Sequence, residues 1–117
     1  MRYVAVVAAL WCAIRVSDLV NDGSRPVVLF LVARNTGAAP VDFTKAKTSL
    51  QIDGKPMANW DAVLAKGAEP VWRSVPPGKH LPLGVDVTGQ LAQPGAHTLK
   101  LTGDCTSNEA RILTPKR

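Results

Sequence analysis

The amino-acid sequence predicts an all-β protein, an antiparallel β-sandwich of seven or eight short strands with at most one short helix near residues 59–66. Three observations support this prediction. Val, Leu, Ile and Thr are abundant whereas Glu occurs only twice, which favours strands over helices. Segments that alternate apolar and polar residues recur along the chain. Clusters of Gly, Pro, Asn and Asp separate these segments at regular intervals, as turns do.

Length and composition indicate one globular domain. The 117 residues are 46% hydrophobic and 20% charged, which suits a folded chain with its own core. We expect an apolar N-terminal segment at residues 1–13, either a signal remnant or a first strand, and a sandwich over residues 14–117. The net charge is +5, but the 14 Lys and Arg residues are spread along the chain. We therefore expect a solvated basic surface, with no specific nucleic-acid partner.

The apolar run "YVAVVAALWCAI", residues 3–14, has three interpretations. As a helix it would span about 18 Å, short of the roughly 30 Å hydrocarbon core of a bilayer, so we expect no transmembrane helix. Met1-Arg2 and the run itself match the start of a secretion signal, although Trp11 stands where a cleavage site needs a small residue. The alternatives are a first strand that bends between sheets and a strand that leaves the domain.

The same run also has the period of a strand. Val4, Val6 and Leu10 fall on one face at a spacing of two. One strand over residues 3–19 would be about 56 Å long, roughly three times a typical strand. A projecting apolar strand can add to the sheet edge of another copy, so these three residues are the ones expected to carry strand donation.

Alternating residues from Ile14 to Leu19 predict a strand, and the turn cluster at residues 21–24 follows it. The most apolar interior run, "PVVLFLVA" at residues 26–33, is typical of a central strand that is buried on both sides or nearly so. The segment 34–40 is rich in Asn, Gly and Pro and predicts the next turn.

Residues 48–52 alternate again, and Asp53-Gly54 is a favoured pair for a two-residue hairpin turn of type I′. Pro56 places the returning strand at a sheet edge, because proline has no N–H to donate to a neighbour. A helix is expected in residues 58–69, where Asn59 can cap its start and Gly67 can end it.

The last third of the chain continues the strand pattern. A short strand is expected to begin at Trp72 and to end at "VPPG", residues 75–78. Residues 79–87 alternate, and "DVTGQL" predicts a bend or a single helical turn. Pro94-Gly95 turns the chain into a final hairpin that ends near residue 113.

These segments resemble bacterial secreted immunoglobulin-like domains. The stretches "VLFLVARNTGAAPVDF" and "SVPPGKHLPLGVDVTGQLAQPGAHTLKL" are similar to strands and Pro-Gly turns of such domains over residues 14–113. Two relatives share this likeness: the BsuPI-type proteinase inhibitors, which also carry a Trp before the Pro-Gly turn, as at Trp72, and the non-catalytic sandwich of deuterolysin-type proteases. The resemblance implies an immunoglobulin-like topology. The chain lacks the His-Glu-x-x-His motif, so the resemblance implies no protease domain.

The residues that could carry chemistry are few. His80, His97 and Cys105 are the main candidates for a catalytic group, and we interpret all three as structural. The chain has no Cys-x-x-Cys and no His-x-x-x-His, so we expect no metal and no cofactor. Cys12 and Cys105 either form one disulfide near the chain ends or remain two buried thiols.

The tryptophans are the strongest candidates for recognition. Trp72 and Arg73 form the preferred pair, with Trp60 as a further candidate, because Trp and Arg carry much of the binding energy at interfaces. The alternative is that Trp60 and Trp72 both pack in the core.

The sequence therefore predicts a non-enzymatic binding module outside the cytoplasm, in the periplasm, at the cell surface or secreted. It would hold a protein or a cell-wall polymer through its loops or an edge strand. Two alternatives remain open at this point. One is a structural subunit that polymerises with itself by donating the N-terminal strand, and the other is a proteinase inhibitor that inserts a loop from residues 54–74.

Overall fold

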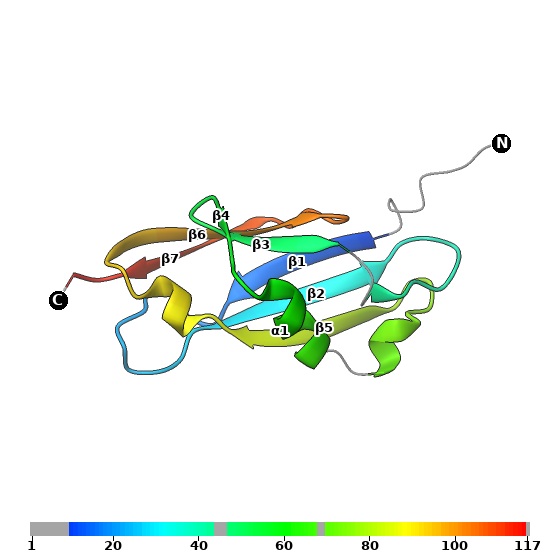
Figure 1. Ribbon diagram of the computed structural model, residues 1–117, viewed down its shortest axis with the longest axis horizontal. Helices are drawn as coiled ribbons and strands as arrows, with labels where there is room; N and C mark the ends of the chain where they lie inside the picture. Colours follow the sequence, from blue (N-terminus) through cyan, green and yellow to red (C-terminus); the bar gives the residue numbers. More distant parts are fainter. Residues whose placement is uncertain (1–9, 44–46, 68–69, 117) are drawn as a thin grey trace.

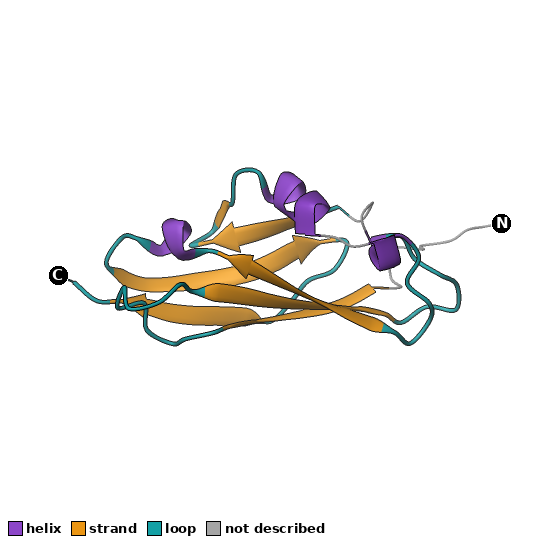
Figure 2. Ribbon diagram, turned by 90° about the horizontal axis from the view of Figure 1, so that it is seen from below, coloured by secondary structure: helices purple, strands orange, loops and turns teal. Residues whose placement is uncertain are grey.

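The computed structural model describes residues 10–43, 47–67 and 70–116, which form two antiparallel sheets packed face to face (Figures 1 and 2). The three-stranded sheet has the order β1-β2-β5, with β1 (Leu10–Val16), β2 (Val28–Asn35) and β5 (His80–Asp86). The four-stranded sheet has the order β4-β3-β6-β7, with β4 (Lys55–Pro56), β3 (Thr48–Ile52), β6 (Gly95–Gly103) and β7 (Glu109–Thr114). The prediction of a mostly β protein with one short α-helix is confirmed at this level.

Leucines from both sheets fill the space between them. These side chains are fully buried, with an exposed fraction of 0%: Leu29, Leu31, Leu50, Leu99 and Leu101. They alternate with outward-facing residues along their strands because successive side chains of a strand point to opposite faces. One continuous core therefore joins the sheets.

The apolar run at residues 26–33 forms most of β2, the central strand of its sheet. Only one of its faces is buried: Leu29 and Leu31 are covered, whereas Phe30 and Val32 are half-buried. The strand was expected to be buried on both sides or nearly so, and it is buried on one face and half-buried on the other. In a sandwich of two layers each sheet covers only the inner face of the other.

The hairpin at Asp53-Gly54 forms where the sequence predicts it. Both residues have positive φ angles, 54° for Asp53 and 80° for Gly54, as a type I′ turn requires. Ile52 pairs with Lys55 across the turn, and β4 with Pro56 lies at the edge of the sheet. The turn thereby places the Asp53 carboxylate beside β6.

One open side of the sandwich is closed between β1 and β7. The amide side chain of Asn108 bonds both backbone groups of Ile14 in β1, each at 2.9 Å. The chain after β1 crosses to the other sheet, where Leu19 accepts a hydrogen bond from Leu113 of β7 at 2.9 Å. The regular strand therefore ends at Val16, and the alternating segment after it reaches the opposite sheet, where Leu19 bonds β7.

The other open side is closed by helix α1 (Trp60–Gly67), which contacts both β3 and β5 (Figure 1). Asn59 directly precedes the helix, and its carbonyl accepts the first helical hydrogen bond from the Val63 N–H at 3.0 Å. The Trp60 indole N–H donates to the Thr48 hydroxyl of β3 at 3.0 Å. Eight residues are too few for a stable isolated helix, so this packing holds α1 in place.

The strand expected to begin at Trp72 is absent. Residues Pro70–Arg73 form a 3₁₀ turn, η3, and only Val75 pairs with another segment, through two backbone bonds to Val41. The pairing stops there because Pro76 and Pro77 have no N–H to continue it. The helical turn expected in "DVTGQL" forms as η4 (Thr88–Leu91), also a 3₁₀ turn.

Gly103 occupies a position that should tolerate no side chain. Its φ angle is 117°, and a Cβ there would lie 2.2 Å from the Lys47 carbonyl oxygen. We predict that Gly103→Ala lowers the free energy of unfolding by about 2 kcal/mol or more, measured by urea denaturation. The control Gly89→Ala should change it by less than about 0.5 kcal/mol, since a Cβ at Gly89 meets nothing within 4 Å. Equal effects of the two substitutions would contradict this packing.

Candidate functional site

The tryptophans proposed for recognition lie in the core. Trp60 and Trp72 are each 3% exposed, and the Trp72 ring packs on Phe43 with a centroid distance of 4.7 Å. Arg73 is exposed beside Trp72 but has no accessible indole as a neighbour. The structure therefore places Trp60 and Trp72 in the core, as in the alternative interpretation, and does not bring Trp72 and Arg73 together on a surface.

A disulfide joins Cys12 to Cys105, and their Cα atoms are 6.0 Å apart. Cys12 lies in β1 of the three-stranded sheet, and Cys105 lies between β6 and β7 of the other sheet. The bond therefore links the two layers across 93 positions of sequence. Neither sulfur is available as a nucleophile or as a metal ligand in this state.

Of the residues proposed for strand donation, Val4 and Val6 lie outside the described residues. Leu10 is the first residue of β1, where it pairs with Asn35 of β2 and packs against the core. The outer edge of β1 is partly occupied by Asn108, as described above.

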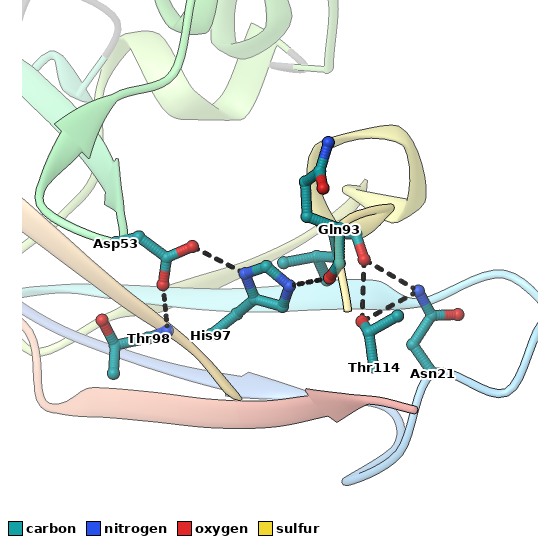
Figure 3. A network of polar contacts seen from close by, with 7 residues as sticks. Asn21, Asp53, Gln93, His97, Thr98 and Thr114 are labelled. Carbon is teal, nitrogen blue, oxygen red and sulfur yellow. Dashed lines mark hydrogen bonds and ion pairs between the residues drawn. The ribbon is translucent and has the colours of Figure 1, made fainter. Parts of the chain in front are cut away.

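His97 forms a polar network that sequence reasoning did not find (Figure 3). Its Nδ1 lies 2.6 Å from Asp53 Oδ2, and its Nε2 lies 2.6 Å from the Gln93 carbonyl oxygen. The second Asp53 oxygen accepts from the Thr98 N–H at 2.9 Å. A carboxylate and a carbonyl both accept hydrogen bonds, so both contacts are complete only when both ring nitrogens carry protons.

This geometry favours the charged forms of both groups. The hydrogen bond that His97 donates to Asp53 raises the pKa of His97 above its usual value, against the opposing effect of burial. The bond from His97 holds the pKa of Asp53 below its usual value. The sequence did carry a signal for the network, because the Asp53-Gly54 turn was predicted. What it lacked was the pairing of β3 with β6, which brings the turn to His97.

A second buried network, at the same end of β6, fastens the chain before β2 (Figure 3). The Asn21 amide donates to the Leu91 carbonyl at 3.3 Å, and the Thr114 hydroxyl donates to the same oxygen at 2.7 Å. These contacts join three segments that are distant in sequence, and we interpret them as structural.

The outer faces of the two sheets differ in character. The outer face of the four-stranded sheet presents mainly polar side chains, including Ser49, Gln51, Thr98, Lys100 and Arg111. The outer face of the three-stranded sheet presents mainly apolar side chains, which are Trp11, Ala13, Val28, Phe30, Val32 and Pro82. Trp11 is 50% exposed. We call this second surface the apolar face.

The pairing of β1 with β2 arranges the apolar face in rows. Trp11 lies opposite Arg34, Ala13 lies opposite Val32, and Arg15 lies opposite Phe30. The Arg15 guanidinium carbon lies 5.2 Å from the centroid of the Phe30 ring. Each of the two basic residues is therefore placed beside an aromatic one, with an apolar row between them.

Neither Arg15 nor Arg34 forms an ion pair within the described residues. In the same part of the chain, no group of three or more His, Cys, Asp or Glu residues is arranged to hold a metal ion. None of the helices in the described residues has the length and apolar character needed to cross a membrane.

Comparison with known proteins identifies a fold and no family. No protein-family model matches the chain, and no curated protein matches it. Among solved structures, it is similar to the Pseudomonas fluorescens alkylpurine DNA glycosylase AlkC bound to DNA containing an abasic site analog, with a TM-score of 0.58 and 13% identity. The match covers 92% of this chain and 31% of that one. At this identity the likeness concerns the fold alone.

The His97–Asp53 pair predicts a defined pH dependence. Because the pKa of His97 is raised on folding, its contribution to stability is fully present below about pH 6.5 and is lost as the pH rises through the raised value. Asp53→Asn keeps the turn and the acceptor for Thr98 but removes the charge. We expect this variant to lower the pKa of His97, measured by NMR titration, and to flatten the loss of stability above neutral pH.

The control for this prediction is Asp104→Asn, at the other end of β6, which accepts a hydrogen bond from the Lys47 N–H. It should leave the His97 titration unchanged. An unchanged His97 pKa in Asp53→Asn would show that the pair is not coupled as described.

Proposed function

We propose that this chain is a non-enzymatic interaction module that works outside the cytoplasm. The observation that supports this most directly is the structural use of its reactive side chains. Cys12 and Cys105 are bonded to one another, and both nitrogens of His97 are engaged by Asp53 and Gln93. Two of the three candidates for a catalytic group, Cys105 and His97, thus hold the fold together, and the third, His80, is an exposed residue of β5. This supports a role carried by the surfaces.

The disulfide supports the proposed location. Disulfides form and persist in oxidising compartments and are rare in the cytosol. A bond between the two sheets would be kept in the periplasm, at a cell surface or in a secreted protein. Cys12 must then remain in the mature chain, so a cleaved leader would have to end before this residue.

We also propose an immunoglobulin-like topology for the sandwich. β2 pairs with β5, and β3 pairs with β6, so the strands of each sheet come from distant parts of the sequence. This exchange between two antiparallel sheets is typical of Greek-key sandwiches. Such domains commonly present binding surfaces on a rigid frame, and this supports an interaction role.

The experiment is mass spectrometry of the protein from its native cells, before and after reduction. We expect a mass lower by about 2 Da before reduction, in a fraction outside the cytoplasm, because the bond removes two hydrogens. Direct alkylation of both cysteines without reduction would contradict the proposed location. A hydrolytic activity that is lost in His97→Asn or Cys105→Ser would contradict the non-enzymatic role.

A further inference from the structure

We propose that the apolar face binds an extended segment of a partner protein, in which two carboxylates four residues apart flank apolar side chains. This inference rests on the proposed function as an interaction module. It specifies which surface binds, which chemical groups the partner presents and which conformation the partner adopts.

β2 is more apolar than its place in the described fold requires. Its sequence is that of a strand covered on both faces, yet the described fold covers only the face with Leu29 and Leu31. Val28, Phe30 and Val32 form an apolar row on the uncovered face, and Ala13 and Pro82 extend it to both neighbouring strands. These side chains are half-buried, apart from exposed Pro82, and Trp11 beside them is 50% exposed. A continuous apolar surface of this kind is typical of a place where another molecule docks.

The apolar face also carries two arginine side chains. Arg15 and Arg34 interrupt the apolar face, and neither pairs with a carboxylate in the described part of the chain. Exposed His80 lies opposite Arg34 near Trp11, whereas Asp86, which is bonded to Thr88, lies opposite Val28 at the other end of the face. Guanidinium groups bind carboxylates through paired hydrogen bonds, which makes an acidic partner complementary to this face.

The distance between the two rows that contain an arginine matches an extended partner. The Trp11–Arg34 row and the Arg15–Phe30 row are four strand positions apart, which is about 13 Å. In an extended chain, side chains four residues apart lie on the same face at the same separation. In a helix they would be only about 6 Å apart. An extended acidic segment therefore matches both rows, and its intervening apolar side chain would meet the Ala13–Val32 row.

The arrangement of the aromatic rings favours a protein over a single-stranded nucleic acid. Nucleic-acid sites of this kind stack successive bases on open aromatic faces. Phe30 is enclosed between Arg15 and Gly84, where a Cβ would lie 3.8 Å from Phe30 Cε1. Among the described residues, Trp11 is the one aromatic side chain of this face that is exposed, at 50%.

The test is selection of a displayed library of random twelve-residue peptides on the full, oxidised chain. We expect enrichment of peptides with Asp or Glu at positions i and i+4 and an apolar residue at position i+2. Selected peptides are then synthesised, and their binding is measured by fluorescence anisotropy. Raising the salt concentration should weaken binding, since the attraction is partly electrostatic.

Two pairs of variants locate the surface. Arg15→Ser with Arg34→Ser should weaken binding at least about tenfold, whereas Lys100→Ser with Arg111→Ser, which removes the same charge from the other sheet, should change it less than about twofold. Trp11→Ser should also weaken binding, whereas Leu113→Ser, at a residue 47% exposed on the other sheet, should not. Circular dichroism and melting curves check that every variant is folded.

The following results would overturn the inference. Failure to enrich acidic peptides would exclude the proposed partner chemistry. Equal weakening by both charge variants would assign the effect to net charge alone. Tight binding of a twelve-nucleotide oligo(dT) that depends on Arg15 and Arg34 would assign the face to nucleic acid. Acidic peptides that bind elsewhere would overturn the surface while the proposed interaction role stands, because the mass and activity measurements test that role separately.

Discussion

The rest of the structure depends on the covalent link between Cys12 and Cys105. This bond ties the first strand of one sheet to the β6–β7 turn of the other, and it closes most of the chain into one loop of 93 positions. A cross-link over a loop of this length restricts the unfolded chain strongly, and the entropy model assigns it about 4–5 kcal/mol. Asn108 adds a second link beside it, because its side chain bonds Ile14 in β1. The two sheets are thereby held at one side by a covalent bond and at the other by α1.

This arrangement explains the division between the inside and the outside of the molecule. Three side chains that could act as a nucleophile or a base, Cys12, Cys105 and His97, instead stabilise contacts between distant segments. On the outside of the three-stranded sheet, Trp11 is half exposed, and Arg15 and Arg34 form no ion pair in the described chain. Because the interior contacts stabilise the sheets, the side chains of an outer face can be used for binding on a rigid element.

Much of the fold could be predicted from the sequence because it is encoded locally. The turn at Asp53-Gly54, the edge position of Pro56 and the helix after Asn59 follow from the conformational preferences of those residues. The site could not be predicted in the same way. The surface that we assign needs the register of β1 and β2, which sets Trp11 beside Arg34. Trp60 and Trp72 were proposed for recognition because composition alone does not distinguish an indole that fills the core from one that faces solvent.

The central claim is that the Cys12–Cys105 bond holds the two sheets together. The most direct measurement is the free energy of unfolding of the oxidised chain and of the double variant Cys12→Ala, Cys105→Ala, both from urea denaturation. The account predicts that the variant loses about 3–5 kcal/mol. A loss below about 0.5 kcal/mol would contradict it, because the sheets would then be held by their core and hydrogen bonds alone.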